Sequence, residues 1–567
     1  MENYDDFFQE GPELQNQFND DALLLSYLKR VLPEDMLKQI TPDLERLGDR
    51  VVKDIYDMGI DAELNEPYLK QFDVWGKKIN EVVVSDGWQE LEEVSAEEGL
   101  VAIGYERKYG DLSRVYQFAK LYLFTPSSAV FTCPLAMSDG AIRLIEVYGD
   151  QELKSIAIKN LTSRDPSEFW TSTQQMTERT GGSDVARALT IAEKTDIEGE
   201  YKLFGHKWFV SAVTAQMGMT LAKIRQEDGN IIPGSRGLSL FYLKMRNKDG
   251  TYNNIEIEAL KDKLGTRALP TAQLSLNGSL AKLVGEEGNG IKKIATLFNV
   301  TRIYNALSAV SFMRRAIALS LDYAKKREAF KELIINHPLH IQSLARMQTE
   351  FEGAFQLTFF EVALMGKVEC GTATTNEKVL LRLLTPIAKL YTAKQSIEVV
   401  SEYLEMLGGI GYLEDTGFPK LLRDTQVLSI WEGTTNVLSL DMLRAIEKDQ
   451  AYYPLIETID DKLKQITLPE LIQDKGKVSD AFEKLQLFFK QAFAIGKEYL
   501  NLSSRDLSYS IARIMISVLL LEHAQWCHIN NTYPNSLAVA HEWCKKNLSV
   551  FEIIEDVDID HFKSIIQ

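Results

Sequence analysis

Two short segments of the sequence contain the residue types that proton transfer and anion binding require. Glu432 lies beside Trp431, just before a helical run. A positioned carboxylate of this kind can act as a general base. Far upstream, residues 176–184 form a glycine-rich turn that bears hydroxyl groups and follows a predicted strand. Backbone N–H groups of such a turn can approach an anion closely, because glycine has no Cβ.

Each segment alone has an ordinary structural interpretation. Acidic residues favour helix N-termini, so Glu432 by itself would most often be a solvated or helix-capping carboxylate. The Gly-Gly-Ser-Asp sequence at 181–184 would most often be only a turn. The functional interpretation therefore depends on both segments occurring in one chain, in this order, with further matching motifs between them.

The elements that position these residues follow from hydrophobic periodicity. From about 20 to 165, and again from Gly290 to about 450, apolar residues recur every three or four positions, which predicts helices, including long ones around 306–326 and 385–407. Between these blocks, strands are predicted at 201–210, 238–243 and 273–276, separated by turn residues. A β-rich block between helical blocks, without βαβ alternation, predicts an α+β fold.

Composition excludes several classes of protein. The 567 residues are 45% hydrophobic and 25% charged, as in an ordinary globular protein of several domains. A net charge of −18 does not favour non-specific attraction to nucleic acid. The four cysteines are widely scattered and there are only 7 histidines, which argues against a metal centre and fits a reducing compartment.

The sequence also predicts where the protein resides. The apolar run at 514–521 is too short to span a bilayer and predicts a buried helix, so we expect no transmembrane segment. The first residues, 1–6, are acidic and polar, unlike a signal peptide. We therefore expect a cytoplasmic protein.

Six motifs in order resemble the acyl-CoA dehydrogenase family, and more closely its AidB-like branch. The motifs are residues 177–184, residues 205–211, Arg302 within 299–302, Arg327 within 326–330, residues 407–412 and residues 431–434. The branch is indicated by residues 132–140, by Trp431 in place of the more usual tyrosine, and by the extra C-terminal segment. The resemblance covers roughly residues 40 to 450, and beyond them only the AidB-like branch is similar.

The resemblance implies four domains. These are an N-terminal helical domain (1–165), a middle β-barrel or sandwich domain that covers a flavin (166–285), a C-terminal four-helix bundle with the catalytic base (286–450), and an additional helical domain (451–567).

The resemblance also implies a reaction and its residues. Members remove an α-proton and a β-hydride from a fatty acyl-CoA thioester, using FAD, and the family's base corresponds to Glu432. The expected FAD contacts are Met176, Thr177, Ser183, Phe209, Ser211, Arg327, Gly408, Gly409, Thr434 and Asn436. Arg302, with Ser183, is expected near the thioester and CoA. Because Arg327 matches an arginine that reaches FAD of a neighbouring subunit, we expect a homo-oligomer, by analogy a tetramer.

The sequence departs from the family pattern mainly where CoA would bind. Asn299 replaces the usual acidic residue, and Glu405 stands where many members have glutamine. Ala329 and Lys331 replace a small hydroxyl residue and a glycine. These changes weaken the expectation of CoA binding more than that of FAD binding.

Three functions therefore stay open. The first is an acyl-CoA dehydrogenase that passes electrons to an electron-transfer flavoprotein, and the second is an oxidase that passes them to O₂. The third is an AidB-like flavin protein that binds or senses fatty acyl groups, or protects DNA, with little turnover. Residues 451–567 hold 12 Lys and Arg against 16 Asp and Glu, which disfavours nucleic acid as a partner.

Overall fold

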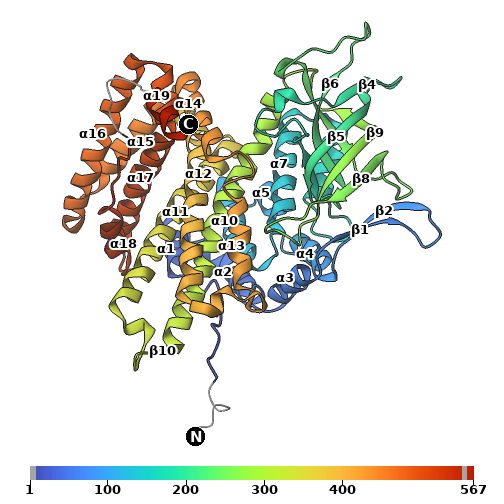
Figure 1. The fold of residues 1–567 in the computed structure, drawn as a ribbon. Coiled ribbons are helices and arrows are strands. Elements are labelled where there is room, and N and C mark those ends of the chain that lie inside the picture. The colour runs from blue at the N-terminus through green and yellow to red at the C-terminus, as the bar shows by residue number, and fades with distance from the viewer. Residues whose placement is uncertain (1–7, 552–558) are drawn as a thin grey trace. The chain divides into compact units, whose positions relative to one another are not determined.

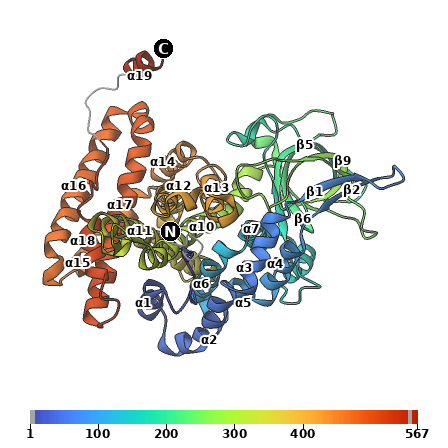
Figure 2. The ribbon, with the colours of Figure 1, turned by 60° about the horizontal axis from the view of Figure 1, so that its bottom comes forward.

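The computed structural model describes residues 8–551 and 559–567 (Figures 1 and 2). The chain divides into two compact units, one made of residues 1–42 and 305–567 and the other of residues 43–304. Along the sequence, the helices α2 (Glu34–Arg50) and α10 (Gly290–Lys326) contain the points of division. Glu432 belongs to the first unit, and the glycine-rich turn at 176–184 belongs to the second.

The unit of residues 43–304 begins with helices, as predicted. They are α3 (Asp54–Leu64), α4 (Asp86–Glu97), α5 (Ala102–Glu106), α6 (Ser113–Phe124), α7 (Thr132–Tyr148), α8 (Gln151–Leu153) and α9 (Lys159–Leu161). Asp139, from the motif at 132–140, is fully buried in α7 and accepts hydrogen bonds from Arg114, Gln117 and Tyr304. This network joins α6 and α7 to the part of α10 that belongs to the same unit, two residues from Arg302.

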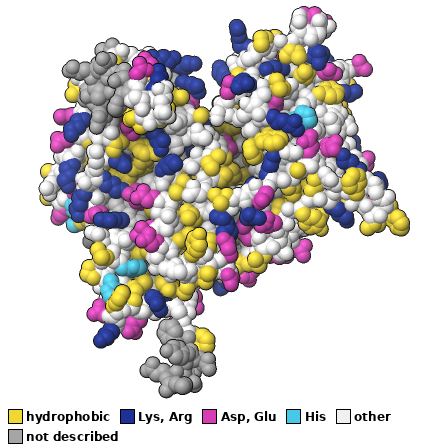
Figure 3. Space-filling view, in the orientation of Figure 1, with side chains coloured by type: hydrophobic (Ala, Val, Ile, Leu, Met, Phe, Trp, Pro, Cys, Tyr) yellow, Lys and Arg dark blue, Asp and Glu magenta, His cyan; other side chains and the backbone are white. Residues whose placement is uncertain are grey.

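Within the block that was predicted to be mostly helical, residues 68–83 form an antiparallel hairpin of β1 (Tyr68–Phe72) and β2 (Lys78–Val83), which the sequence did not indicate. The cause is local, since the side chain of Asp73 accepts from the N–H groups of Trp75 and Lys77 and closes a turn. Val74 and Trp75 are 88% and 90% exposed at the tip. Hydrophobic side chains are visible at the end of this hairpin in Figure 3.

The predicted β-rich block is a seven-stranded sheet that closes on itself. Its strands are β3 (Ser172–Gln175), β4 (Ile191–Lys194), β5 (Glu200–Ser211), β6 (Met217–Ile224), β7 (Leu238–Lys244), β8 (Ile255–Leu260) and β9 (Thr271–Leu283). The order is β3-β6-β4-β5-β9-β7, and β6 also pairs with β7, so five strands form a ring. The buried face is apolar, with Leu203, Phe241 and Leu274 in one cluster. β5 pairs with β4 at 201–204 and with β9 from 200 to 211, so its C-terminal end is held in the barrel by β9.

The other unit is a helical bundle. Its helices before residue 450 are α1 (Ala22–Val31), α11 (Pro338–Cys370), α12 (Thr375–Met406), α13 (Phe418–Val427) and α14 (Thr435–Asp449), together with the second part of α10. The start of α12 is a capping box, in which Thr374 and Glu377 satisfy each other's backbone N–H groups. α12 packs against α11 and α14, so it is the central helix of this group.

The additional C-terminal helices are α15 (Tyr452–Gln465), α16 (Ile472–Ile495), α17 (Lys497–Ile529), α18 (Ser536–Trp543) and α19 (Ile559–Ile566). Residues of α15 to α18 share the core of this unit, whereas the described residues of α19 are exposed or half-buried. α17 packs against α11, α12 and α14, and Met515 shares one apolar cluster with Leu384 and Leu438. Within the described residues α17 is the one helix long and apolar enough to cross a membrane, and 83% of its most apolar stretch is buried in the protein. The predicted buried helix at 514–521 and the predicted α+β fold with helices, β-barrel, bundle and extra helices are confirmed.

Candidate active site

Glu432 is carried by a short loop between α13 and α14. After α13, the N–H groups of Ile430 and Trp431 both donate to the carbonyl of Val427, which adds one more turn. Thr434 then occupies the N-cap position of α14. The loop is therefore fixed at both ends, and the Glu432 side chain between them is half-buried.

Two successive residues of this loop have left-handed backbones. The φ angles of Glu432 and Gly433 are 56° and 107°. A residue other than glycine is strained in this region and stays there only when its surroundings enforce it, as they often do at functional sites. Gly433 leaves no room for a side chain, since a Cβ there would lie 2.9 Å from Cδ2 of Leu438.

Two buried polar side chains hold the loop. On its N-terminal side, the indole N–H of Trp431 donates to Oδ1 of Asn305, and Nδ2 of Asn305 donates to the carbonyl of Leu428 at 3.2 Å. On its C-terminal side, the ammonium of Lys389, which is fully buried in α12, donates to the carbonyl of Gly433 at 2.7 Å. Neither Asn305 nor Lys389 was predicted from the sequence to have a role in the site.

In the other unit, the turn at 176–184 is closed by its glycines. The N–H of Gly181 donates to the carbonyl of Glu178 at 2.9 Å, and Gly181 has φ of 108°. At Gly182 a Cβ would lie 2.6 Å from Oγ1 of Thr177, so only glycine fits without displacing that hydroxyl. Met176 is buried, Thr177 is half-buried and Ser183 is exposed. The structure thus brings these three predicted flavin contacts onto one tight turn.

A buried ion pair fastens this turn to the barrel. Glu178 accepts from Nζ of Lys207 at 2.8 Å and from the hydroxyl of Thr190. Burial alone would raise the pKa of Glu178, but the Lys207 ammonium and the hydrogen bonds from Thr190 and Leu189 outweigh it and hold the pKa below its ordinary value. The carboxylate is therefore charged at neutral pH and holds the turn against β5.

The end of β5 carries the residues predicted to cover a flavin. Phe209 is 54% exposed, and Ser211 lies within hydrogen-bond distance of Thr271, 3.1 Å between the hydroxyl oxygens. The backbone N–H of Trp208 donates to the carbonyl of Thr177 at 2.9 Å, which joins this strand directly to the glycine-rich turn. The Trp208 ring is half-buried beneath the ammonium of Lys261, 3.4 Å from the ring centroid.

Three features of this unit fit the FAD that the resemblance implies. Phe209 offers an exposed aromatic face beside the hydroxyl of Ser211. Gly181 and Gly182 expose backbone without side chains. The hydroxyl of Thr180 is buried and has no hydrogen-bond partner among the described residues. The exposed ring of Phe209 can stack against a flat ring, and the exposed backbone of Gly181 and Gly182 can form hydrogen bonds with groups next to that ring.

The remaining predicted FAD contacts belong to the helical unit. Arg327 donates to Oε1 of Gln9 at 3.1 Å, just before the small hairpin of β10 (Glu328–Ala329) and β11 (Glu332–Leu333). Lys331 has φ of 69°, the conformation that the family's usual glycine would adopt without strain. Gly408 and Gly409 are exposed, and a Cβ at either would meet no atom of the chain.

Thr434 and Asn436, also predicted near FAD, are exposed at the start of α14, close in sequence to Glu432. Arg302 is half-buried on α10, one helical turn after Asn299. Arg302 belongs to residues 43–304, the same unit as Ser183.

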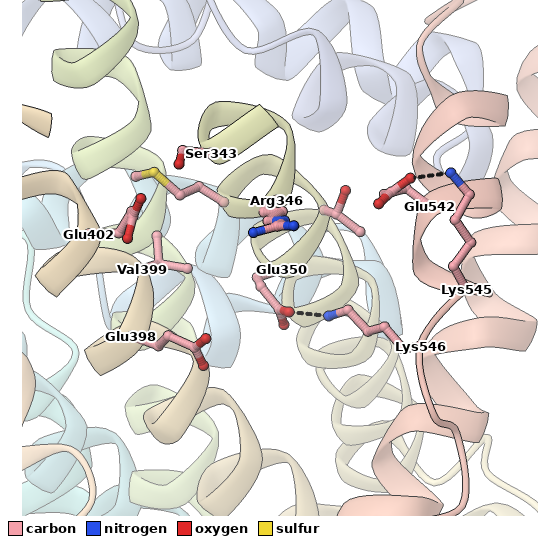
Figure 4. Close-up of a pocket in the computed structure, with 11 residues that line it drawn as sticks. Ser343, Arg346, Glu350, Glu398, Val399, Glu402, Glu542, Lys545 and Lys546 are labelled. Carbon is pink, nitrogen blue, oxygen red and sulfur yellow. Dashed lines mark hydrogen bonds and ion pairs between the residues drawn. The ribbon is translucent and has the colours of Figure 1, made fainter. Parts of the chain in front are cut away.

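The helical unit also contains a pocket of about 370 Å³ lined by α11, α12 and residues 542–546 (Figure 4). Two ion pairs lie in its lining: Lys545 binds Glu542 at 2.6 Å within one segment, and Lys546 binds Glu350 on α11. None of the predicted site residues lines it. The pocket therefore adds no residue to the candidate active site.

Comparison with known families accounts for almost the whole chain. Residues 10–165 match the adaptive response protein AidB N-terminal domain, and residues 173–279 match the acyl-CoA dehydrogenase middle domain. Residues 288–447 match the acyl-CoA dehydrogenase C-terminal domain, and residues 450–564 match the acyl-CoA dehydrogenase 11 C-terminal domain-like family.

Individual relatives agree with these matches. Acyl-CoA dehydrogenase family member 11 of Caenorhabditis elegans is 42% identical over 557 residues, covering 95% of this chain and 88% of that protein. Putative acyl-CoA dehydrogenase AidB of Escherichia coli is 31% identical, covering 70% and 73%. The crystal structure of C. elegans ACDH-11 in complex with C11-CoA superposes with a TM-score of 0.95 at 39% identity, over 100% of this chain and 97% of that one. The crystal structure of an acyl-CoA dehydrogenase complexed with FAD from Bacillus anthracis has the same fold, with a TM-score of 0.72 at 18% identity, and FAD is the cofactor of the family. The chain belongs to the acyl-CoA dehydrogenase family, in its AidB-like branch.

Proposed function

We propose that the protein catalyses the FAD-dependent α,β-dehydrogenation of a fatty acyl-CoA, with Glu432 as the base. The observation that carries this proposal is the strained, clamped backbone at Glu432, because such strain is retained where geometry matters. The Glu432 carboxylate would take the α-proton as the α C–H bond breaks. Bound FAD would supply the acceptor for the hydride that leaves the β-carbon, so that the substrate would lose two electrons and gain a carbon–carbon double bond.

The chain's own residues have separate tasks in this scheme. Glu432 must lie within hydrogen-bond reach of the α-proton. Phe209, Ser211, Met176, Thr177 and Ser183 would hold the flavin ring and its phosphate side, supported by the Glu178–Lys207 pair. Arg302, together with Ser183, would bind near the thioester, and positive charge there suits the CoA phosphates.

The chemical class of the substrate follows from the relatives. ACDH-11 has been crystallised with C11-CoA, and it resembles this chain over its whole length. We therefore propose a straight fatty acyl-CoA of about this length as the substrate, and an electron-transfer flavoprotein as the electron acceptor. The four free cysteines support a reducing compartment, in keeping with the cytoplasm.

The test is an anaerobic titration of the FAD-containing protein with saturated acyl-CoAs of increasing chain length, C11-CoA among them. We expect one range of chain lengths to bleach the flavin absorbance. Readmitting O₂ then separates the two catalytic possibilities, since rapid reoxidation indicates an oxidase and slow reoxidation a dehydrogenase. Tight binding of acyl-CoA without bleaching would overturn the proposal in favour of a protein that binds or senses fatty acyl groups.

A further inference from the structure

Lys389 is a charged residue in a part of α12 where every neighbour in sequence is apolar or buried. Its side chain has no exposed surface, and Ile387, Ala388 and Leu390 around it are buried as well. Removing an ammonium from water is costly unless it is bound by compensating groups. Among the groups that bind this ammonium is the carbonyl of Gly433, which accepts a hydrogen bond of 2.7 Å and lies 44 residues further along the chain.

The acceptor of that hydrogen bond is the residue after the catalytic base. A backbone carbonyl fixed at Gly433 restricts the rotation of the Gly433 peptide groups, and Gly433 is itself left-handed and packed against Leu438. Glu432 immediately before it keeps a left-handed conformation that a glutamate does not adopt without help. The Lys389 contact is therefore placed where it can stabilise that conformation.

The other side of the loop is held separately. Trp431 is bound by Asn305, which is also bound to Leu428, so the chain entering Glu432 is fixed from α10. The chain leaving Glu432 is fixed from α12 by Lys389. With the two anchors in place, the direction in which the Cα–Cβ bond of Glu432 leaves the backbone is fixed on both sides of the residue.

We propose that Lys389 is a positioning residue for the dehydrogenation, whose buried ammonium holds the Gly433 carbonyl and so keeps Glu432 in the left-handed backbone conformation that aims its carboxylate at the substrate. This proposal rests on the proposed role of Glu432 as the base. Lys389 acts through Glu432 and touches neither substrate nor cofactor in this scheme.

The test compares Lys389→Met, which keeps the length of the side chain and removes its charge and N–H donors, with Lys462→Met. Lys462 is a matched control in the same unit: its side chain is 15% exposed and its ammonium binds Glu522 at 2.7 Å. The measurements are FAD content, thermal unfolding, and anaerobic flavin reduction by C11-CoA in a stopped-flow instrument at several substrate concentrations.

We expect both variants to unfold at lower temperature than the wild type. Lys389→Met should reduce its flavin at least tenfold more slowly at saturating C11-CoA, with unchanged FAD content and an unchanged half-saturating concentration. Lys462→Met should keep the wild-type limiting rate. A Lys389→Met protein that binds FAD normally and is reduced at the wild-type rate would overturn the proposal.

A second variant covers the case in which Lys389→Met does not fold. Lys389→Gln keeps an N–H donor in a neutral, shorter side chain, and we expect it to be reduced more slowly than the wild type. The proposal would be contradicted if a crystal structure of Lys389→Gln showed the Gly433 carbonyl no longer bound by residue 389, while the variant was reduced at the same limiting rate as the wild type.

A measurement without substrate separates this proposal from the proposed function. In hydrogen–deuterium exchange, peptides covering residues 428–434 should exchange faster in the Lys389 variants than in the wild type and in Lys462→Met. If the wild type is not reduced by any acyl-CoA, the proposed function fails, and the exchange result still decides whether Lys389 holds the loop. Unchanged exchange at 428–434 would refute the positioning role by itself.

Discussion

At the residue scale, the buried Glu178–Lys207 ion pair stabilises the attachment of the turn at 176–184 to strand β5. The two side chains are 4% and 0% exposed, so neither charge can be solvated if its partner is removed. We expect Lys207→Met to lower the free energy of unfolding by about 3–5 kcal/mol, the usual result of leaving a buried charge alone. Urea unfolding at pH 7 measures this change.

The double variant Lys207→Met/Glu178→Gln is the control for that experiment, because it removes both charges. It should be less destabilised than Lys207→Met alone. If the double variant is destabilised as much as the sum of both single variants, the two charges do not act as a pair.

The same pair makes a prediction about pH. In the folded protein the pKa of Glu178 lies below its ordinary value of 4.5. The carboxylate therefore adds stability at pH values above 4.5, and that contribution is lost as the pH falls through the lower pKa of the folded state. Glu178→Gln should be less stable than the wild type at pH 7, and the difference should shrink towards pH 3. A difference that stays constant over this range would contradict the assignment.

At the element scale, the glycine-rich turn makes a prediction about FAD. Gly182→Ala would place a Cβ 2.6 Å from the Thr177 hydroxyl, which must then move away from its present position. We expect the dissociation constant of FAD to rise about tenfold, equivalent to about 1.4 kcal/mol. Fluorescence titration of the apoprotein with FAD measures it.

Gly476→Ala is the matched control for this substitution. Gly476 is an exposed residue of α16, and a Cβ there would meet nothing. This variant should keep the wild-type FAD affinity and gain about 0.5–1 kcal/mol of stability from better helix propensity. Equal FAD affinities in the two variants would show that Thr177 and its turn do not contact the flavin.

The helices and strands differ in how well they could be predicted from the sequence. The strand β5 and the central parts of the helices α10 and α12 were predicted because their patterns extend over many residues, whereas only 273–276 of the longer strand β9 was predicted. The hairpin at 68–83 was missed, since it is short, exposed and closed by a turn at Asp73 rather than by a buried pattern. The irregular register between Lys207 and Val210, where the β5–β9 pairing shifts, also could not be predicted from the alternation of residues along β5.

In the candidate active site, too, only features that are local in the sequence could be predicted. Motif spacing identified Glu432 and the turn at 176–184, whose residues are close in sequence. Lys389 and Asn305 could not be recognised as the residues that hold Glu432, because each meets the loop only after folding has joined distant segments. The one local signal was a single lysine in the apolar run at 386–391, and such a pattern does not say which atom the lysine binds.

At the scale of the whole molecule, the proposed role of Arg327 implies an oligomer. If Arg327 reaches FAD in a neighbouring subunit, Arg327→Ala should weaken FAD binding while the oligomeric state of the protein stays that of the wild type. Sedimentation velocity combined with the flavin absorbance measures both properties at once. A monomeric wild-type protein with tightly bound FAD would contradict the shared site.

The most direct test of the whole account is the anaerobic reduction of the flavin by C11-CoA in the wild type and in Glu432→Gln. The glutamine keeps the shape of the side chain but cannot accept the α-proton. We expect Glu432→Gln to bind FAD and C11-CoA and to be reduced at least about 100-fold more slowly, the lower limit of what general-base catalysis contributes. Reduction of Glu432→Gln at the wild-type rate would show that another group removes the proton and that Glu432 is not the base.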